Sequence, residues 1–405
     1  MCSHFRWLLA STTSGSLADG IATTAMPLLL VGLTTDPVLV ALLQVALGLP
    51  WLMFSLHVGV LVDRLDRRTI LWVADASRAV LAAMLVLLVV VDAVSVPLLL
   101  VVAFLEGTAT VVFRAASPAM LPSLVARDDL ARANGHIQTG SVVTGGFVGP
   151  ALGGVLYPLT ALAPFVAQSA SMLVSVLCLR RLPARPAAQD KTEPATVRAD
   201  IREGLRTVVA DRVLRSLAVT TCLLASSTGM LQAVLVLHVL GALDAPEGAY
   251  GVLFTIFAAG CLVGTRLVPR IRDRFGGRAC LLIAAGLGAA SLLIIGCAPT
   301  AYVAGVGMAL LGIGSMVYNI AAVTLRQERT PDDLLGRVSS VFNLVGVGAI
   351  PVAALLAGSI AAATSTTWAL LVAAATCMAG LLWLVFDMGP ADGPVDQGRE
   401  GAHVA

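Results

Sequence analysis

Three acidic residues, Asp19, Asp75 and Glu106, lie inside long apolar stretches of the chain. Placing a carboxylate at the centre of a membrane span costs about 2.5–3.5 kcal/mol on insertion scales, so each needs a compensating role. Loss of water favours the neutral acid, and a carboxyl group in that setting can take up and release a proton. The alternative is a permanent hydrogen bond that fixes two helices. Both interpretations stay open for Asp19 and Glu106.

A local pairing is also visible in the sequence. Asp75 and Arg78 are three residues apart, a spacing that places both side chains on one face of a helix. Each charge can neutralise the other in lipid. We therefore predict an intramembrane ion pair with a structural role.

The composition determines what surrounds these charges. Of 405 residues, 58% are hydrophobic and 12% are charged, whereas a soluble globular protein has roughly 25% charged residues. Most of the surface must therefore face lipid. The net charge of +2 indicates no particular partner, and we expect no nucleic acid. The seven cysteines are scattered without metal-ligand spacing and are interpreted as small core residues.

Apolar segments of about 20 residues, the length of a membrane-spanning helix, recur in two groups of six. They lie near 7–33, 38–62, 69–91, 96–117, 137–157, 159–180, 216–240, 249–268, 279–297, 300–323, 338–361 and 367–386. This predicts an all-α membrane protein with twelve transmembrane helices in two pseudo-symmetric six-helix bundles. The expected division is a first bundle at 1–182, a linker at 183–215, a second bundle at 216–387 and a tail at 388–405.

Basic residues are confined to alternate breaks between these segments. The breaks at 34–37, 157–158 and 241–249 contain no lysine or arginine, whereas the opposite breaks, the termini and the linker contain many. By the positive-inside rule, the basic side is cytoplasmic. We expect a multi-pass protein of the cell membrane with both termini and the linker in the cytoplasm.

The linker contains a repeating apolar pattern. Ile201, Leu205, Val208, Val209 and Val213 recur at helical spacing among charged residues. This predicts an amphipathic helix on the cytoplasmic membrane interface. A passive strut between the halves and a regulatory helix are the two interpretations.

A charged block joins the second and third segments. It reads Gly-Val-Leu-Val-Asp-Arg-Leu-Asp-Arg-Arg over 59–68, and Asp273, Arg274 and Arg278 repeat part of it in the second half. A chain that returns to the same charged hairpin contains two related membrane halves. This organisation is typical of secondary transporters.

The fifth segment contains a glycine motif. Gly145, Gly149 and Gly153 are four residues apart and form a smooth helix face, followed by Gly154. Pro150 lacks a backbone N–H and should kink the helix. The full pattern is G-x-x-x-G-P-x-x-G-G.

These motifs resemble those of the major facilitator superfamily. The order G-x-L-x-D-R-x-x-R-R is similar to the inter-helix motif of that superfamily, and the glycine motif is similar to the fifth-helix motif of its drug:proton antiporters. The stretches at 118–122, 130–135, 203–205 and 326–338 are similar to the exporter branch that includes macrolide efflux pumps and the enterobactin exporter. The resemblance covers essentially the whole chain.

The resemblance implies roles for both motifs. It implies a cytoplasmic latch between the halves that contains Gly59, Asp63, Arg64, Arg67 and Arg68, with Asp273, Arg274 and Arg278 as the second-half counterpart. Arg114 either joins Asp63 in this latch or only anchors the fourth helix. The fifth-helix motif is associated with export. Asp19 and Glu106 are placed on two helices that line the central cavity.

The second half has few polar groups within its segments. They are Gln232, Asn319 and Asn343, among the apolar residues Met230, Phe254, Phe257, Met308 and Met316. A cavity with one acidic wall and one soft apolar wall suits an amphipathic organic molecule, including a cationic one.

We therefore expect a proton-coupled exporter of small amphipathic molecules, such as drugs, antibiotics or siderophores, that works as a monomer in the lipid bilayer by alternating access. The alternatives are an importer or uncoupled facilitator of the same fold, and a non-transporting sensor. An enzyme is not expected, because the segments contain no H-E-x-x-H motif and no convincing His/acid cluster. We expect neither a cofactor nor a metal, and the absence of a phosphate-binding loop argues against coupling to ATP.

Overall fold

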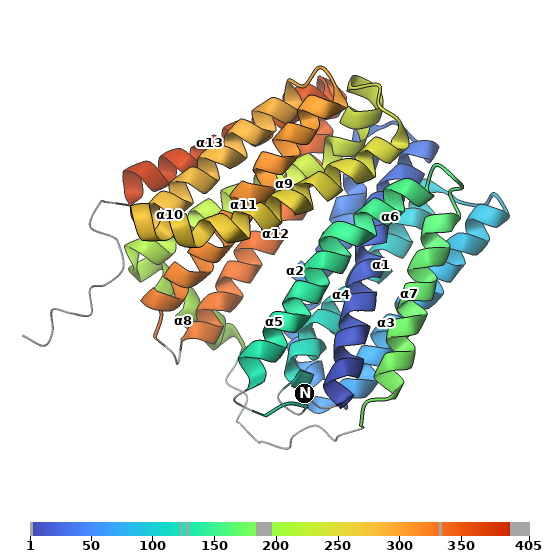
Figure 1. Ribbon diagram of the computed structural model, residues 1–405, viewed down its shortest axis with the longest axis horizontal. Coiled ribbons are helices and arrows are strands. Elements are labelled where there is room, and N and C mark those ends of the chain that lie inside the picture. Colours follow the sequence, from blue (N-terminus) through green and yellow to red (C-terminus); the bar gives the residue numbers. More distant parts are fainter. Residues whose placement is uncertain (1–2, 122–123, 127–128, 184–196, 332–333, 389–405) are drawn as a thin grey trace, which may run out of the picture.

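The computed structural model describes residues 3–121, 124–126, 129–183, 197–331 and 334–388, apart from the side chains at positions 3, 55–56, 59–64, 119, 131 and 197–201. Within these ranges all regular structure is helical (Figure 1). The expected all-α fold is therefore confirmed for the part of the chain that the structure describes.

The first half supplies six spans. Its helices are α1 (Ser3–Leu33), α2 (Pro37–Arg64), α3 (Arg67–Val90), α4 (Val96–Met120), α5 (Leu130–Ser141), the π-helix η3 (Val142–Val148), α6 (Gly149–Leu156) and α7 (Ala163–Arg180). The segments α5, η3 and α6 follow one another without a break and form the fifth span together.

The second half begins with a short helix outside the spans. Its helices are α8 (Val197–Ala210), α9 (Arg212–Leu237), the π-helix η4 (His238–Ala242), α10 (Glu247–Gly296), α11 (Ala301–Arg329), α12 (Leu335–Ala363) and α13 (Thr366–Asp387). The described residues contain 11 helices, counted as continuous runs, that are long and apolar enough to cross a membrane.

Helix α10 accounts for two of the expected spans. Its 50 residues would extend about 75 Å if straight, whereas the hydrocarbon core is about 30 Å thick. Gly276 has φ 81° and ψ 170°, a conformation that a residue with a Cβ rarely adopts. At this residue α10 doubles back on itself (Figure 1). With α10 counted as two limbs, the described spans number twelve, as the sequence predicts.

The kink expected in the fifth span coincides with η3. Pro150 offers no N–H to the preceding turn, and its ring crowds the carbonyl four residues earlier. A π-helical turn is a common adjustment to such an interruption. η3 ends at Val148, two residues before the proline, so the wider turn precedes the interruption directly.

Capping residues fix where several helices begin. The Asp66 carboxylate accepts a hydrogen bond from the backbone N–H of Thr69 at 3.1 Å and so starts α3. Asp211 accepts from the backbone N–H of Leu214 at 2.8 Å and starts α9. Both satisfy N–H groups that a helix start leaves free. The seventh span therefore begins a few residues before the expected position 216.

The cores show how the two halves meet. We call the end that carries α8 and the start of α1 the linker end, and the opposite end the distal end. At the distal end a single core combines side chains of both halves, among them Leu30, Leu99, Val234 and Leu292. At the linker end each half has its own core, which includes Leu71 in the first half and Leu281 in the second. The halves are therefore joined distally and separate at the linker end.

Small residues allow the distal closure. A Cβ on Gly154 of α6 would lie 2.5 Å from the Cα of Gly251 in α10, and one on Gly358 of α12 would lie 2.5 Å from the Cβ of Ala41 in α2. Such contacts let helix backbones from opposite halves approach closely. The closed distal end therefore combines the shared apolar core with close glycine contacts.

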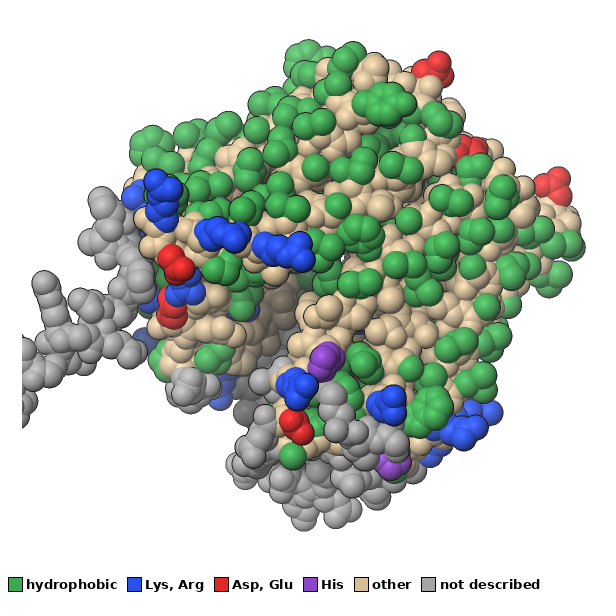
Figure 2. Space-filling model, viewed as in Figure 1, with side chains coloured by type: hydrophobic (Ala, Val, Ile, Leu, Met, Phe, Trp, Pro, Cys, Tyr) green, Lys and Arg blue, Asp and Glu red, His purple; other side chains and the backbone are tan. Residues whose placement is uncertain are grey.

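Charge differs between the two ends. The exposed distal carboxylates are Asp36, Asp92, Asp244 and Glu247, and the described loops at that end contain no arginine or lysine. Arginines gather toward the linker end (Figure 2). This segregation matches the charge pattern along the sequence.

Helix α8 is attached to the second half. Val208 is buried in the second-half core, and Glu203 pairs with Arg337 of α12 at 2.8 Å. Of the expected apolar face, Leu205 and Val209 are 49% and 53% exposed, and the side chain of Ile201 lies outside the described residues. The strut and regulatory interpretations stay predictions.

The distal closure can be tested by placing a larger side chain at a glycine contact. We expect Gly154→Val to separate the distal ends, because its side chain would overlap the Gly251 backbone and overpacking of this kind costs about 1–3 kcal/mol. Spin labels on the natural Cys297 and on Ser95→Cys, with the other cysteines removed, report the distance between the halves. Gly241→Val is the control, because a Cβ there meets nothing within 4 Å. An unchanged Gly154→Val distance distribution would contradict this closure.

Candidate functional site

A cavity of about 590 Å³ lies between the halves at the linker end. Figure 2 shows the molecule hollowed between its two lobes on that side. A second cavity of about 400 Å³ borders it, and both include Ser117, Pro118, Ile137 and Gln138 in their walls. The volume suits a drug-sized ligand.

The two walls of the 590 Å³ cavity differ in polarity. The first half contributes hydroxyl groups, the side chains of Asp19, Arg78 and Arg114, and the glycine face of the fifth span. The second half contributes only Phe257, Ala258, Cys261 and Met316. Phe257 and Met316 are thus cavity residues, as expected, whereas Met230 and Met308 are 4% and 1% exposed in the distal core. The wall is charged with both signs rather than only acidic.

Asp19 and Asp75 both interact with Arg78. The Arg78 guanidinium forms an ion pair with Asp19 of α1, and its Nη1 donates to Asp75 Oδ1 at 3.2 Å on α3. The Asp75 and Arg78 side chains are 0% and 2% exposed, whereas that of Asp19 is 30% exposed and borders the cavity. The link between Asp19 and Arg78 joins two helices and could not be read from spacing.

Two serines extend this network to α7. Ser175 Oγ donates to Asp75 Oδ2, and the hydroxyl groups of Ser11 and Ser175 are 2.7 Å apart. Ser175 and Ser11 are fully buried. Serine is common in membrane helices, so the sequence carried no signal that would single them out.

Glu106 pairs with Gln168 of α7 and also lies within electrostatic range of Arg78. Gln168 Nε2 donates to Glu106 Oε1, while Glu106 Oε2 and Gln168 Oε1 are buried without a hydrogen-bond partner. Glu106 is 4% exposed and is absent from the cavity wall. Sequence reasoning missed Gln168, although a buried amide in an apolar helix needs a partner and was a usable signal.

The expected latch is only partly described. Gly59, Asp63 and Arg64 lie outside the residues whose side chains the structure describes, so the pairing of Asp63 with Arg114 stays a prediction. Arg68 donates to the Arg180 carbonyl at 2.5 Å within the first half. Arg67 also has a partner, and Arg114 borders the cavity.

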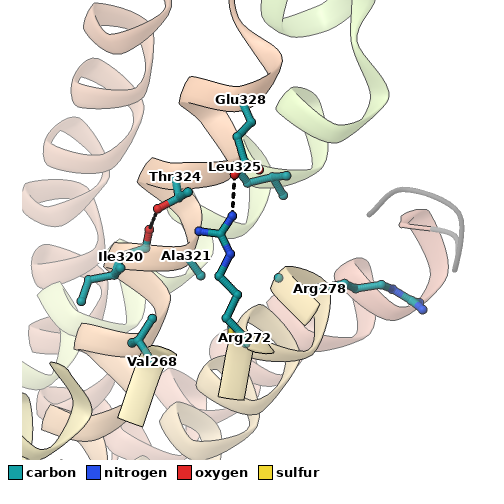
Figure 3. A pocket seen from close by; sticks show the side chains of 10 residues that line it. Val268, Arg272, Arg278, Ile320, Ala321, Thr324, Leu325 and Glu328 are labelled. Atoms are coloured by element: carbon teal, nitrogen blue, oxygen red, sulfur yellow. Dashed lines mark hydrogen bonds and ion pairs between the residues drawn. The ribbon is translucent and has the colours of Figure 1, made fainter. Parts of the chain in front are cut away.

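The second-half counterpart makes contacts within its own half. Arg278 donates to the Val385 carbonyl at 3.2 Å, and Arg274 lies over the Phe275 ring at 5.2 Å. Asp273 is exposed. The ion pair between α10 and α11 instead joins Arg272, which the sequence analysis did not single out, to Glu328 at 2.5 Å (Figure 3).

The fifth-span glycines pack against α1. A Cβ on Gly149 would lie 2.7 Å from the Cα of Gly20, and one on Gly145 would lie 3.0 Å from the Ser16 carbonyl oxygen. Gly153 meets Thr24 in the same way. Pro150 is buried beside them. The motif therefore brings the fifth span against the helix that carries Asp19.

Comparisons with known proteins give the family. A family model described as transmembrane secretion effector matches residues 2–394. The chain belongs to this family of major facilitator transporters. It is therefore a multi-pass membrane transporter of small molecules and not an enzyme, which confirms the expected superfamily.

Curated relatives of this family member include efflux proteins. Multidrug efflux pump Tap of Mycolicibacterium fortuitum is 28% identical, with 87% of this chain and 88% of that protein covered. Macrolide efflux protein A of Streptococcus pyogenes is 26% identical, with 76% and 77% covered. Enterobactin exporter EntS of Citrobacter koseri is 24% identical, with 75% and 72% covered. The predicted exporter branch is thus confirmed.

Solved structures support the fold. The nucleoside transporter NupG superposes with a TM-score of 0.75 at 12% identity, covering 95% of this chain and 99% of NupG. A bacterial homologue of the iron transporter ferroportin in an inward-facing state gives 0.73 at 16% identity, with 94% and 96% covered. At these identities the likeness extends to the fold alone.

The buried network can be tested by charge removal. We expect Arg78→Met to destabilise the protein by about 3–5 kcal/mol, because it leaves buried Asp75 without its countercharge. Adding Asp75→Asn should recover part of the loss. Arg272→Met breaks a half-exposed pair and should cost at most about 1 kcal/mol. Unfolding in mixed detergent–SDS micelles gives the free energy of unfolding of each variant. Equal losses of this free energy in Arg78→Met and Arg272→Met would contradict a central role for Arg78.

Proposed function

We propose that this transporter exports small amphipathic organic molecules, of the drug, antibiotic or siderophore type, in exchange for protons. It works as a monomer in the cell membrane, with its termini and linker in the cytoplasm. The observation that carries the proposal is the 590 Å³ cavity between two halves that share a core at the distal end and have separate cores at the linker end. The efflux relatives and the fifth-span motif support outward transport.

The difference between the two ends of the molecule supports alternating access. The described state is closed distally and open at the linker end, so substrate enters from the cytoplasm. Outward opening requires the Gly154–Gly251 contact to separate and the two linker-end cores to approach each other. The latch motif around Asp63 would then bridge the halves. Rocking of two bundles about a central site is the established mode of this architecture.

The cavity walls support an amphipathic substrate. Phe257 and Met316 offer an apolar, adaptable surface. The opposite wall offers hydroxyl groups and charged side chains of both signs. A molecule with an apolar body and a polar edge satisfies both walls, whereas a fully hydrated ion satisfies only one.

Asp19 is the proposed exchange site. Two carboxylates face one guanidinium, so Asp19 can bind a proton while Asp75 still compensates Arg78. Its 30% exposure toward the cavity also gives it access to water. Protonation would weaken the link between α1 and α3 and so connects proton binding to helix movement.

Glu106 is proposed to hold a proton in this state. A neutral carboxyl could donate from Oε2 to the unpartnered Gln168 Oε1, while Gln168 Nε2 donates to Glu106 Oε1. This acid–amide pair satisfies two buried oxygen atoms at once. Glu106 then joins α4 to α7 and does not exchange its proton during transport.

Coupling can be measured in vesicles whose linker end faces outward. An acidic lumen should drive uphill uptake of hydrophobic antibiotics, dyes or siderophores by the wild type, and an uncoupler should abolish it. We expect Asp19→Asn to lose uphill uptake yet retain downhill flux, because the exchange site is fixed as neutral. Glu106→Gln should retain coupling, since two amides can still pair.

Each alternative has a distinct outcome in this assay. Full coupling in Asp19→Asn would remove Asp19 from the mechanism. Flux that does not depend on the pH gradient in the wild type would favour a facilitator. Gradient-driven movement of substrate out of the lumen would favour an importer. Ligand binding without flux would favour a sensor.

Orientation can be tested with a natural cysteine. Cys297 is exposed at the distal end, which is the external side in the proposed topology. We expect a membrane-impermeant maleimide to label intact cells expressing the wild type and not the Cys297→Ser variant. Labelling that requires permeabilised cells would reverse the orientation, and with it the proposed direction of substrate loading.

A further inference from the structure

One face of α10 changes character along its length. Exposed apolar residues Val252 and Val263 occupy this face toward the distal end and are 51% and 45% exposed. Arg266, Arg270 and Arg274 continue it toward the linker end, each four residues from the next, and all three are exposed. Residues at such spacing share one helix face. A row of basic side chains is visible over α10 in Figure 2.

These three arginines differ from several other arginines at the linker end. Several of the others contact a neighbouring element: Arg68 with Arg180, Arg180 with Trp72, Arg181 with Trp7, Arg272 with Glu328, Arg278 with Val385, Arg326 with Phe342 and Arg337 with Glu203. Figure 3 shows Arg272 directed at Glu328 of α11.

No ion pair joins Arg266, Arg270 or Arg274 to a described carboxylate, including the adjacent Asp273. Among the described residues, Arg270 donates to the Arg266 carbonyl at 3.4 Å, and Arg274 stacks on Phe275. Both contacts are within α10. The three guanidinium groups therefore keep their charge available on the outer face of the molecule.

Their depth is set by helix length. At 1.5 Å per residue, Arg266 lies about 28 Å from the distal start of α10 at Glu247, and Arg270 and Arg274 lie about 34 and 40 Å from it. The hydrocarbon core is about 30 Å thick. The apolar part of this face therefore lies against acyl chains, and the arginines begin where headgroups begin.

We infer that Arg266, Arg270 and Arg274 form a binding site for an anionic phospholipid. Guanidinium groups bind phosphate oxygens in a bidentate manner. Neighbouring arginines of this face are one helical turn apart, so two guanidinium groups can bind the same phosphate. Val263 and its apolar neighbours receive the acyl chains. The site lies outside the substrate cavity and holds the second half in one leaflet.

The test uses the full-length protein in uncharged detergent with added phosphatidylglycerol or phosphatidylcholine. Thermal unfolding as a function of lipid concentration gives the half-saturating concentration. Phosphatidylglycerol should stabilise the wild type. The half-saturating concentration of phosphatidylglycerol should be about 100-fold higher for the triple variant R266Q/R270Q/R274Q, because a basic residue near an anionic surface contributes about fivefold in affinity. Inorganic phosphate and glycerol phosphate at equal concentrations should not stabilise it.

A matched control is the triple variant R6Q/R132Q/R206Q, which removes three exposed arginines elsewhere at the linker end. Its apparent affinity for phosphatidylglycerol should fall by less than fivefold. If the triple variant does not fold, the three single variants of the proposed site replace it. Each is expected to lose about fivefold in apparent affinity for phosphatidylglycerol. Equal losses in the two triple variants, equal stabilisation by phosphatidylcholine, or stabilisation by free phosphate would each overturn the inference.

Discussion

The structure depends on how one buried guanidinium is compensated. Arg78 is almost fully enclosed, and Asp75 and Asp19 supply two negative charges against its single positive one. Asp75 is itself enclosed and accepts a hydrogen bond from Ser175, and in the proposed mechanism it stays the countercharge of Arg78. Asp19 can therefore change its charge without leaving Arg78 unpaired. The same three residues join α1 to α3 in the first half and include the carboxyl group that is proposed to exchange protons.

Close helix packing connects Asp19 on α1 with the distal contact between the halves. The fifth-span glycines bring the span against α1, which carries Asp19, and Gly154 on the same span touches Gly251 across the distal contact between the halves. Glycine contacts leave no side chain to absorb a displacement. A shift of α1 is thus passed to the distal closure through direct backbone contact. The geometry provides a physical connection between the proposed proton site and the contact that must open.

The sequence predicted what depends on local spacing and missed what depends on helix faces. Hydropathy and charge segregation defined twelve spans, and the spacing of Asp75 and Arg78 predicted their contact. Asp19–Arg78 and Glu106–Gln168 join distant segments, and hydropathy does not say which face of a helix meets which neighbour. Met230 and Met308 were assigned to the cavity for this reason, yet they lie at a depth where the two halves meet and form the core.

The two halves divide the work of transport. The first half contains the intramembrane charges, whereas the cavity wall of the second half is apolar. The second half also carries α8, held through the Glu203–Arg337 pair, and the arginine face of α10. The proposed rocking is a relative motion of the halves, and the proposed lipid site would attach the second half to the headgroup layer. In the proposed mechanism, lipid bound along α10 holds the second half, and the first half, which carries the proposed proton site, tilts relative to it.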